Sequence, residues 1–217
     1  TGNTLNNVVF NEGLTTVSWL ATDAAGNTSS GCSFTVNVTD NVLPLISCPS
    51  DITHGNDPGL CSYSFTVTPA SATDNCGVDQ ITGTRSDGLP LSDPYPVGVT
   101  TIIWKAVDLA GNTSLPCSQK ITVTDSEKPE FTVPPAVTVC RAPDCTYDLN
   151  ILPSLTGVVT GENDNCTPSS AFLISYSDND SGITDCNVAG SIVRTWKVTD
   201  QAGNYTEKTQ TISVEPV

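Results

Sequence analysis

The chain of 217 residues contains no methionine, a single histidine (His54) and only 8 lysine or arginine residues. Its 23 aspartate and glutamate residues give it a formal net charge of −15. An acidic surface of this kind repels nucleic acid and anionic membrane surfaces, so neither is expected as a partner. No apolar run approaches the roughly 18 residues that a membrane-spanning helix needs, and we predict no membrane span.

The residues of a zinc site are also scarce. The sequence has no Cys-x-x-Cys pair, and its one histidine leaves little for metal–thiolate ligation. Nine cysteines in an acidic, threonine-rich chain are instead typical of disulfide bonding in an oxidising compartment. We therefore predict a secreted or cell-surface protein.

What the chain does have is a nine-residue motif that occurs three times. It reads WLATDAAGN at 19–27, WKAVDLAGN at 104–112 and WKVTDQAGN at 196–204. A period of about 90 residues indicates tandem domains rather than a solenoid of small repeats.

Alignment on this motif predicts three domains. They are the C-terminal half of a first repeat (1–40), a complete repeat (41–125) and a divergent repeat (126–217). The linkers 38–44 and 123–129 both end in proline, which stiffens a junction. Because the chain starts inside a repeat, without methionine or signal peptide, we interpret it as a mature or internal piece of a longer secreted polypeptide.

Apolar and polar residues alternate with a period of two in several segments, which predicts half-buried strands. These segments are 62–69, 100–108, 119–125, 191–200 and 209–216. About seven strands per repeat favour an all-β fold of tandem immunoglobulin-like β-sandwiches with Greek-key topology, arranged end to end. We place the motif's tryptophan and the small residue two positions later in each core, on the penultimate strand. The pairs are Trp19 and Ala21, Trp104 and Ala106, and Trp196 and Val198.

The middle repeat resembles a known family. Its ISCPSDI, ATDNC, YPVGVTTIIWKAVDLAGN and closing ITVTD segments are similar to those of a hyalin repeat, or HYR domain. The resemblance covers nearly all of 41–125, weakens at the start of the third repeat and includes only the second half of the first. It implies an immunoglobulin-like extracellular module with adhesive or matrix roles and without catalysis.

Comparison of the repeats predicts disulfides. The third repeat lacks counterparts of both Cys48 and Cys117, as expected for a bonded pair, and closing that loop stabilises the fold by roughly 4 kcal/mol. Elimination then pairs Cys61 with Cys76, Cys145 with Cys166, and Cys140 with Cys186. The pairing of Cys145 with Cys186 and of Cys140 with Cys166 stays open. Cys32 is expected to pair within the first half of its own repeat.

Acidic and amide side chains are expected to converge where one repeat follows another. In such a sandwich, the loop after the second strand, the loop before the last strand and the entering linker meet at one pole. Hard oxygen ligands in turns suit Ca²⁺, and the arrangement is similar to the inter-domain calcium sites of cadherins. The candidate Ca²⁺ ligands are Asp40, Asn41, Asp74, Asn75, Asp108 and Asn112 at the first junction, and Asp125, Glu127, Asp164, Asn165, Asp200 and Asn204 at the second.

Two other interpretations compete with the cation sites. Asp, Asn and Gly are also the residues of tight turns, so the same positions are explained by turn structure alone. Six N-x-Ser/Thr sequons occur, and a glycan on one of the junction asparagines would exclude a cation there. They lie at Asn27, Asn37, Asn112, Asn165, Asn179 and Asn204.

An enzyme is not expected. His54 has no nucleophile motif beside it, and the acidic pairs recur in each repeat, whereas acid–base catalysis needs one asymmetric constellation. We predict a structural or adhesive module that forms a stiff stalk or fibre with neighbouring repeats of its own polypeptide. The alternatives are direct binding of an extracellular protein or glycan, and self-assembly into a filament by exchange of strands at the incomplete first repeat.

Overall fold

The computed structural model describes residues 4–146 and 151–216. Apart from one short helix, α1 (Pro153–Thr156), the regular structure of these residues is β-strand, which confirms the all-β prediction. That helix is too short to cross a membrane. The strands are β1 (Gly13–Trp19), β2 (Cys32–Val38), β3 (Leu45–Ser47), β4 (Ile52–Gly55), β5 (Ser62–Tyr63), β6 (Ser71–Thr73), β7 (Val78–Arg85), β8 (Tyr95–Pro96), β9 (Gly98–Asp108), β10 (Cys117–Thr124), β11 (Glu130–Thr132), β12 (Val137–Cys140), β13 (Thr160–Asn163), β14 (Leu173–Asn179), β15 (Gly190–Thr199) and β16 (Tyr205–Glu215).

Contacts divide the chain into two units, and the division passes through the predicted middle repeat. The first unit is Thr1–Ser50, Val67–Leu91 and Thr101–Gln119, and the second is Asp51–Thr66, Ser92–Thr100 and Lys120–Val217. The long strands β9 and β10 contribute residues to both units. The domain boundaries 1–40, 41–125 and 126–217 stay a prediction.

In the first unit, antiparallel pairs hold the strands together. β1 pairs with β2, β3 with β6, and β7 with β9. Gly83 of β7 lies flat against the Trp104 ring, where an added Cβ would come within 2.7 Å of a ring carbon. The close packing of β7 on Trp104 therefore requires glycine at this position.

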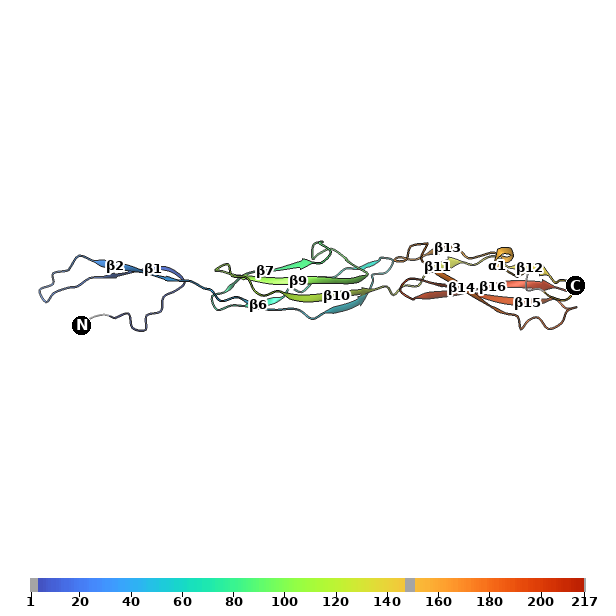
Figure 1. The fold of residues 1–217 in the computed structure, drawn as a ribbon, viewed down its shortest axis with the longest axis horizontal. Coiled ribbons are helices and arrows are strands. Elements are labelled where there is room, and N and C mark those ends of the chain that lie inside the picture. Colours follow the sequence, from blue (N-terminus) through green and yellow to red (C-terminus); the bar gives the residue numbers. More distant parts are fainter. Residues whose placement is uncertain (1–3, 147–150, 217) are drawn as a thin grey trace. The chain divides into compact units, whose positions relative to one another are not determined.

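The second unit contains a complete sandwich. One sheet has the order β12-β16-β15-β14, with β12 parallel to β16, and a second sheet pairs β11 with β13 (Figure 1). Phe131 of β11 and Val159 pack against Trp196 and Val198 of β15, so the core lies between the two layers. Elsewhere in this unit β4 pairs with β10 in parallel, and β5 pairs with β8.

The motif's tryptophan occupies the core in two of its three copies. Trp104 and Trp196 are 2% exposed, and Ala106 and Val198 are fully buried, on the penultimate strands β9 and β15 as predicted. The prediction is wrong for Ala21, which is exposed, while Trp19 is half-buried. The reason is that the described sheet containing Trp19 has only two strands, β1 and β2.

Three disulfides form among the described cysteines. Cys48 bonds Cys117, as predicted, and Cys145 bonds Cys186, the alternative left open above. The third joins Cys61 to Cys166. The predicted pairs Cys61–Cys76, Cys145–Cys166 and Cys140–Cys186 are therefore wrong, and Cys166 is not available for Cys140.

The error for Cys61 and Cys76 has a geometric cause. The backbone N–H of Leu109, just past one end of β9, donates to the Gly77 carbonyl beside Cys76, whereas the N–H of Val97, just before the other end, donates to the Cys61 carbonyl. An eleven-residue strand spans about 35 Å, while a disulfide joins Cα atoms about 6 Å apart. The two cysteines therefore belong to opposite ends of one strand.

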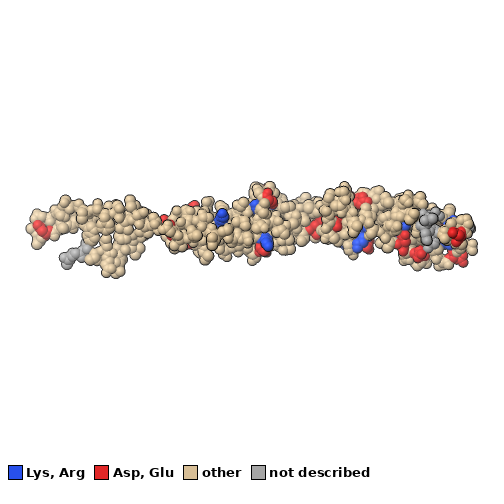
Figure 2. All heavy atoms as spheres, viewed as in Figure 1, with Lys and Arg blue, Asp and Glu red and all other residues tan. Residues whose placement is uncertain are grey.

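Basic side chains are even scarcer on the surface than in the sequence. Arg85, Arg141 and Arg194 are buried, between 1% and 8% exposed. In the visible face, acidic and basic side chains are scattered among uncharged ones rather than gathered into a basic patch (Figure 2). The surface charge therefore remains strongly acidic.

Arg194 lies inside the sandwich of the second unit. Its guanidinium donates to both carboxylate oxygens of Asp178, at 2.7 and 2.8 Å, to the Thr156 hydroxyl and to the Ile151 carbonyl, and it stacks over the Tyr176 ring. One side chain thus joins β14, β15 and the segment around α1.

We predict that Arg194→Met lowers the free energy of unfolding by about 3 kcal/mol, because it leaves the acceptors of a buried ion pair without their donor. Chemical denaturation of the chain measures this loss. The matched control is Lys120→Met, which alters an exposed side chain of β10. An equal effect of both substitutions would contradict a structural role for the Arg194 network.

Candidate metal sites at the repeat junctions

The loop that ends each repeated motif is closed by its aspartate and asparagine. The backbone N–H of Asn112 donates to Asp108 Oδ1 at 2.7 Å, and Asn112 Nδ2 donates to Asp108 Oδ2 at 2.8 Å. The Gly111 N–H donates to the Asp108 carbonyl, and Gly111 has a φ of 90°, which favours glycine. The Asp-x-Ala-Gly-Asn spacing therefore folds as a closed turn.

The other two copies form the same turn. Asn204 donates through its backbone N–H and Nδ2 to the two oxygens of Asp200, at 2.7 and 2.9 Å. Asn27 donates to Asp23 in the same way, at 2.9 and 2.8 Å. The interpretation as turn structure is thus correct for the loop itself, and these hydrogen bonds lower the pKa of Asp23 below its ordinary value.

The second and third copies do more than close a turn. Asn112 Nδ2 also donates to the backbone carbonyl of Asp40 in the entering linker, at 3.1 Å. Asn204 Nδ2 donates to the carbonyl of Asp125 in the next linker, at 3.2 Å. Each asparagine therefore ties its loop to the chain that enters its repeat.

Three carboxylates converge at each junction. One oxygen from each of Asp40, Asp74 and Asp108 lies within 4.8 Å of the others, and the same is true of Asp125, Asp164 and Asp200. The three residues come from the linker, the Asp-Asn-Cys loop and the motif loop. Each unit thus brings three of the six predicted aspartates together.

Each linker and Asp-Asn-Cys aspartate uses one oxygen for the backbone and leaves the other without a partner. Asp74 Oδ1 accepts from the N–H groups of Cys76 and Gly77, and Asp40 Oδ1 accepts from the Val42 N–H. The Oδ2 atoms of these two residues are buried without a hydrogen-bond partner. The second junction repeats this division at Asp125 and Asp164.

The electrostatics of the loop and linker aspartates differ. Burial pushes the pKa of Asp108 upward, but hydrogen bonds from Asn112 and from the backbone of Ala110 and Gly111 outweigh it, and the pKa lies below its ordinary value. Burial raises the pKa of Asp125, and the negative charges of Asp164 and Asp200 raise it further. Asp125 is 9% exposed, so its anion is destabilised where it stands.

The remaining candidate ligands divide into two groups. Asn75 Nδ2 donates to Asp40 Oδ1 at 3.3 Å, so Asn75 belongs to the first cluster, and Asn41 lines the hollow beside it. Glu127 has other partners at the second junction: its Oε1 accepts from the Gly59 N–H at 2.6 Å and from Asn56 Nδ2. Asn165 Nδ2 donates to the Leu60 carbonyl at 2.9 Å.

Asn56, which donates to the Glu127 carboxylate, was not among the residues predicted from the sequence. Asn56 is 8% exposed, its Oδ1 accepts from Ser126, and its Nδ2 donates to the Leu60 carbonyl. It holds the 56–60 loop against the linker within the second unit. The turn residues of the HGNDPG segment (54–59) indicate a loop, but no pattern in the sequence indicates that this loop contacts the linker.

The asparagines of two junction sequons are engaged by the fold. Nδ2 of Asn112 and of Asn204 each donates to a carboxylate and to a linker carbonyl. A glycan would replace one hydrogen of that amide, so the hydrogen bonds compete with glycosylation at these two positions.

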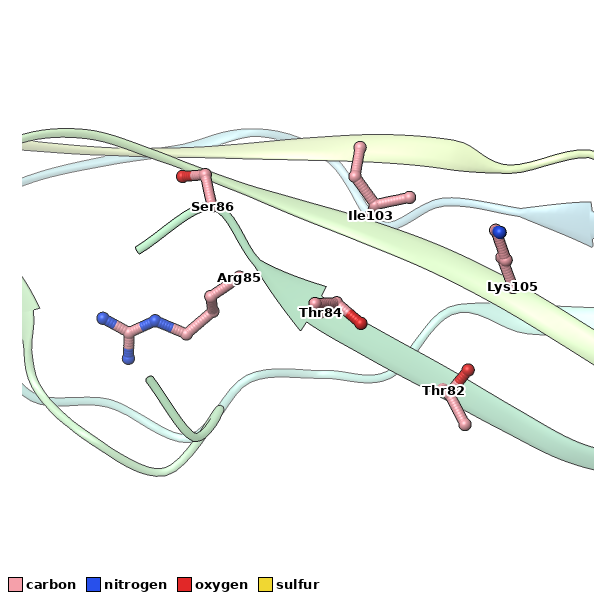
Figure 3. A pocket seen from close by; sticks show the side chains of 6 residues that line it. All are labelled: Thr82, Thr84, Arg85, Ser86, Ile103 and Lys105. Carbon is pink, nitrogen blue, oxygen red and sulfur yellow. The ribbon is translucent and has the colours of Figure 1, made fainter. Parts of the chain in front are cut away.

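Two other features bear on the alternative functions. His54, Tyr63, Phe65 and Tyr95 form a row of ring contacts, with centroids 3.8 to 5.3 Å apart, but Tyr95 is fully buried. A hollow over β7 and β9 is lined by Thr82, Thr84, Arg85, Ser86, Ile103 and Lys105 (Figure 3). These six side chains include no histidine, cysteine or carboxylate.

We predict that Asn112→Ala speeds amide hydrogen exchange in linker residues 40–43 by about fivefold, because one net hydrogen bond to the linker is worth roughly 1 kcal/mol. Asn27→Ala is the matched control, since Asn27 makes the same bonds to Asp23 within its loop. Equal exchange at the linker in both variants would contradict the tie between Asn112 and Asp40.

We predict that Asp125→Asn stabilises the chain in chelator near neutral pH. A carboxyl with a raised folded pKa costs stability above that pKa, and this cost is relieved as the pH falls through it toward the ordinary value of 3.8. The asparagine removes the charge at every pH, so the gain should vanish under acid conditions. Thermal unfolding across pH 3–7 tests this, and a destabilised variant in chelator would contradict it.

Comparison with known proteins supports the resemblance. Residues 39–123 match the HYR domain family model. The chain is 29% identical to hyalin of Strongylocentrotus purpuratus over 200 residues, which covers 90% of the chain and 16% of that protein. It is 34% identical to hyalin of Lytechinus variegatus over 136 residues, or 60% of the chain and 24% of that protein. The chain thus spans between a sixth and a quarter of these relatives.

Among solved structures, the chain is similar to the protocadherin gammaB7 EC3-6 cis-dimer structure, with 14% identity and a TM-score of 0.42 over 92% of the chain and 57% of that structure. It is also similar to Drosophila N-cadherin EC1-4, with 14% identity and a TM-score of 0.40 over 88% and 53%. The match of residues 39–123 to the HYR family model confirms the resemblance of the middle repeat to the hyalin repeat family.

Proposed function

We propose that the chain is a non-catalytic structural and adhesive part of a large extracellular repeat protein, and that Ca²⁺ stiffens its repeat junctions. The extracellular setting is supported by three disulfides, which persist in oxidising compartments. The adhesive role is supported by the HYR domain at 39–123 and by the relation to the two hyalins.

The observation that carries the calcium proposal is the Asp125 carboxylate. It is nine-tenths buried, its Oδ2 has no hydrogen-bond partner, and it faces the charges of Asp164 and Asp200. A buried anion among like charges is unfavourable unless a proton or a cation compensates it. Clustered carboxylate oxygens with no hydrogen on them are the hard ligands that Ca²⁺ prefers.

Turn structure and cation binding are compatible at these positions. In each linker and Asp-Asn-Cys aspartate, Oδ1 caps the backbone while Oδ2 remains available. A turn needs only the Oδ1 atom of such an aspartate. The interpretation as turn structure does not explain why Oδ2 is buried without a partner at all four of these aspartates.

A bound Ca²⁺ would join three chain segments at each junction. At the first junction, Asp40 belongs to the linker, Asp74 directly follows β6, and Asp108 is the last residue of β9. Three carboxylates supply part of the six to eight oxygens that Ca²⁺ takes, and carbonyls or water would complete the set. The expected result is a linker with less freedom relative to its repeat.

The alternative functions have weaker support. A glycan-binding surface would use exposed aromatic side chains, but the row that includes Tyr63 and Phe65 ends at a buried tyrosine. Strand exchange would use the exposed apolar side chains of the β1–β2 ribbon, such as Leu14 and Phe34. Neither surface has a second feature that selects a partner.

We predict that millimolar Ca²⁺ raises the stability of the chain by about 1–2 kcal/mol per site over chelator, as expected for the weak affinity typical of extracellular modules. Differential scanning calorimetry in 5 mM Ca²⁺ and in chelator measures the shift. Asp125→Asn and Asp74→Asn should each remove part of it.

The matched control is Asp79→Asn, which alters an exposed acidic residue of β7 outside both clusters and should leave the Ca²⁺ shift unchanged. Identical melting in Ca²⁺ and in chelator would refute the calcium proposal. A calcium shift that survives loss of the cluster aspartates would refute the assigned ligands.

A further inference from the structure

The two Asp-Asn-Cys loops are built alike, but only one of their cysteines is bonded. The N–H groups of Cys76 and Cys166 donate to Oδ1 of Asp74 and Asp164, at 2.8 and 2.9 Å. The preceding asparagine places its Nδ2 at 3.0 and 3.5 Å from the two sulfur atoms. Cys166 is bonded to Cys61, whereas Cys76 is an exposed free thiol.

The surroundings of the two cysteines also correspond. A hollow beside Cys166 is lined by Val97, Asp125 and Cys61. A hollow beside Cys76 is lined by Glu12 and Asp40, which occupy the positions of Val97 and Asp125 in the repeat. The two hollows therefore share three positions, and the one beside Cys166 also contains Cys61, the cysteine that completes the bond.

The sizes of these hollows support the same comparison. The one beside Cys76 has a volume of about 560 Å³, and the one beside Cys166 about 310 Å³. In the second unit the 56–61 loop lies there, held by Glu127, Asn165 and the disulfide. The larger hollow has room for a loop of this kind next to the Cys76 sulfur.

We propose that Cys76 forms a disulfide with the cysteine of the preceding repeat that corresponds to Cys61, so that successive repeats are covalently joined at both junctions. In the middle repeat Gly98, the glycine that opens β9, lies 37 positions after Cys61. The same spacing before Gly13, which opens β1, places the partner about 25 residues ahead of Thr1.

One difference between the first junction and the second bears on how the incoming loop is held. Val42 stands where Glu127 accepts from the Gly59 N–H, so the incoming loop would pack on an exposed valine instead of donating to a carboxylate. Asn75, the counterpart of Asn165, has its amide directed at Asp40 and can instead donate to the carbonyl beside the incoming cysteine. The disulfide would therefore contribute more to holding the incoming loop at the first junction than it does at the second.

The bond forms by ordinary thiol–disulfide exchange with a low-molecular-weight or protein disulfide as oxidant. One cysteine thiolate attacks the oxidant, forms a mixed disulfide and releases the first thiol. The thiolate of the second cysteine then attacks the protein sulfur and releases the second thiol. Two protein thiols become one disulfide, and the oxidant becomes two thiols.

The experiment is a disulfide map of the natural polypeptide, alkylated before extraction, digested without reduction and analysed by mass spectrometry. The peptide containing Cys76 should be linked to a peptide from ahead of Thr1, at the position that corresponds to Cys61. Cys48–Cys117 and Cys61–Cys166 serve as internal controls in the same digest. Repetition in chelator separates this result from calcium binding, which the disulfide does not require.

Alkylated Cys76, or Cys76 linked to any other cysteine, including Cys61, Cys32 or a cysteine of a second molecule, overturns the proposal. A Cys76→Ser variant of the same polypeptide should release one alkylatable cysteine, in the peptide that the wild-type map joins to Cys76. The matched variant Cys32→Ser should release a different one, since Cys32 corresponds to Cys117, which bonds within its own repeat.

Discussion

The junctions depend on one carboxylate and the asparagine four residues after it. Asp108 and Asp200 each accept two hydrogen bonds from that asparagine, which fixes the amide so that its remaining hydrogen reaches the linker carbonyl. Because the loop holds the amide, the linker cannot move away without breaking the amide–carbonyl bond or pulling the amide from the loop carboxylate. The bond to the charged carboxylate is the stronger of the two. The orientation of Asp40 and Asp125 follows from this constraint.

The same constraint creates the electrostatic problem at each junction. The linker aspartate is brought to within 4.8 Å of two other carboxylates, while its Oδ2 finds no donor. The hydrogen bonds that stabilise the loop aspartate as an anion cannot serve its neighbour. The pKa of Asp108 at the first junction is lowered and that of Asp125 at the second is raised, although both residues are buried. Burial alone does not decide the sign; the donors around Asp108 and the like charges around Asp125 do.

Several features that belong to one repeat could be predicted from the sequence. The motif's tryptophan, the closed Asp-Asn turn and the Cys48–Cys117 bond follow from spacing and from joint loss in the third repeat. Cys61–Cys166 could not be predicted in this way, because comparison of repeats aligns equivalent positions and says nothing of contacts between non-equivalent ones. The contact of Glu127 could not be predicted for the same reason: its partner, Gly59, lies on a loop of the preceding repeat.

The disulfide and the carboxylate cluster act on the same loop at the second junction. Cys166 is bonded to Cys61, and its backbone N–H donates to Asp164, a member of the cluster. A disulfide that fixes this loop also fixes the position of the Asp164 carboxylate before any cation arrives. Since binding to a preorganised site loses less conformational entropy, the covalent bond and the candidate cation site should reinforce each other. Loss of the disulfide should then weaken cation binding without removing a single ligand.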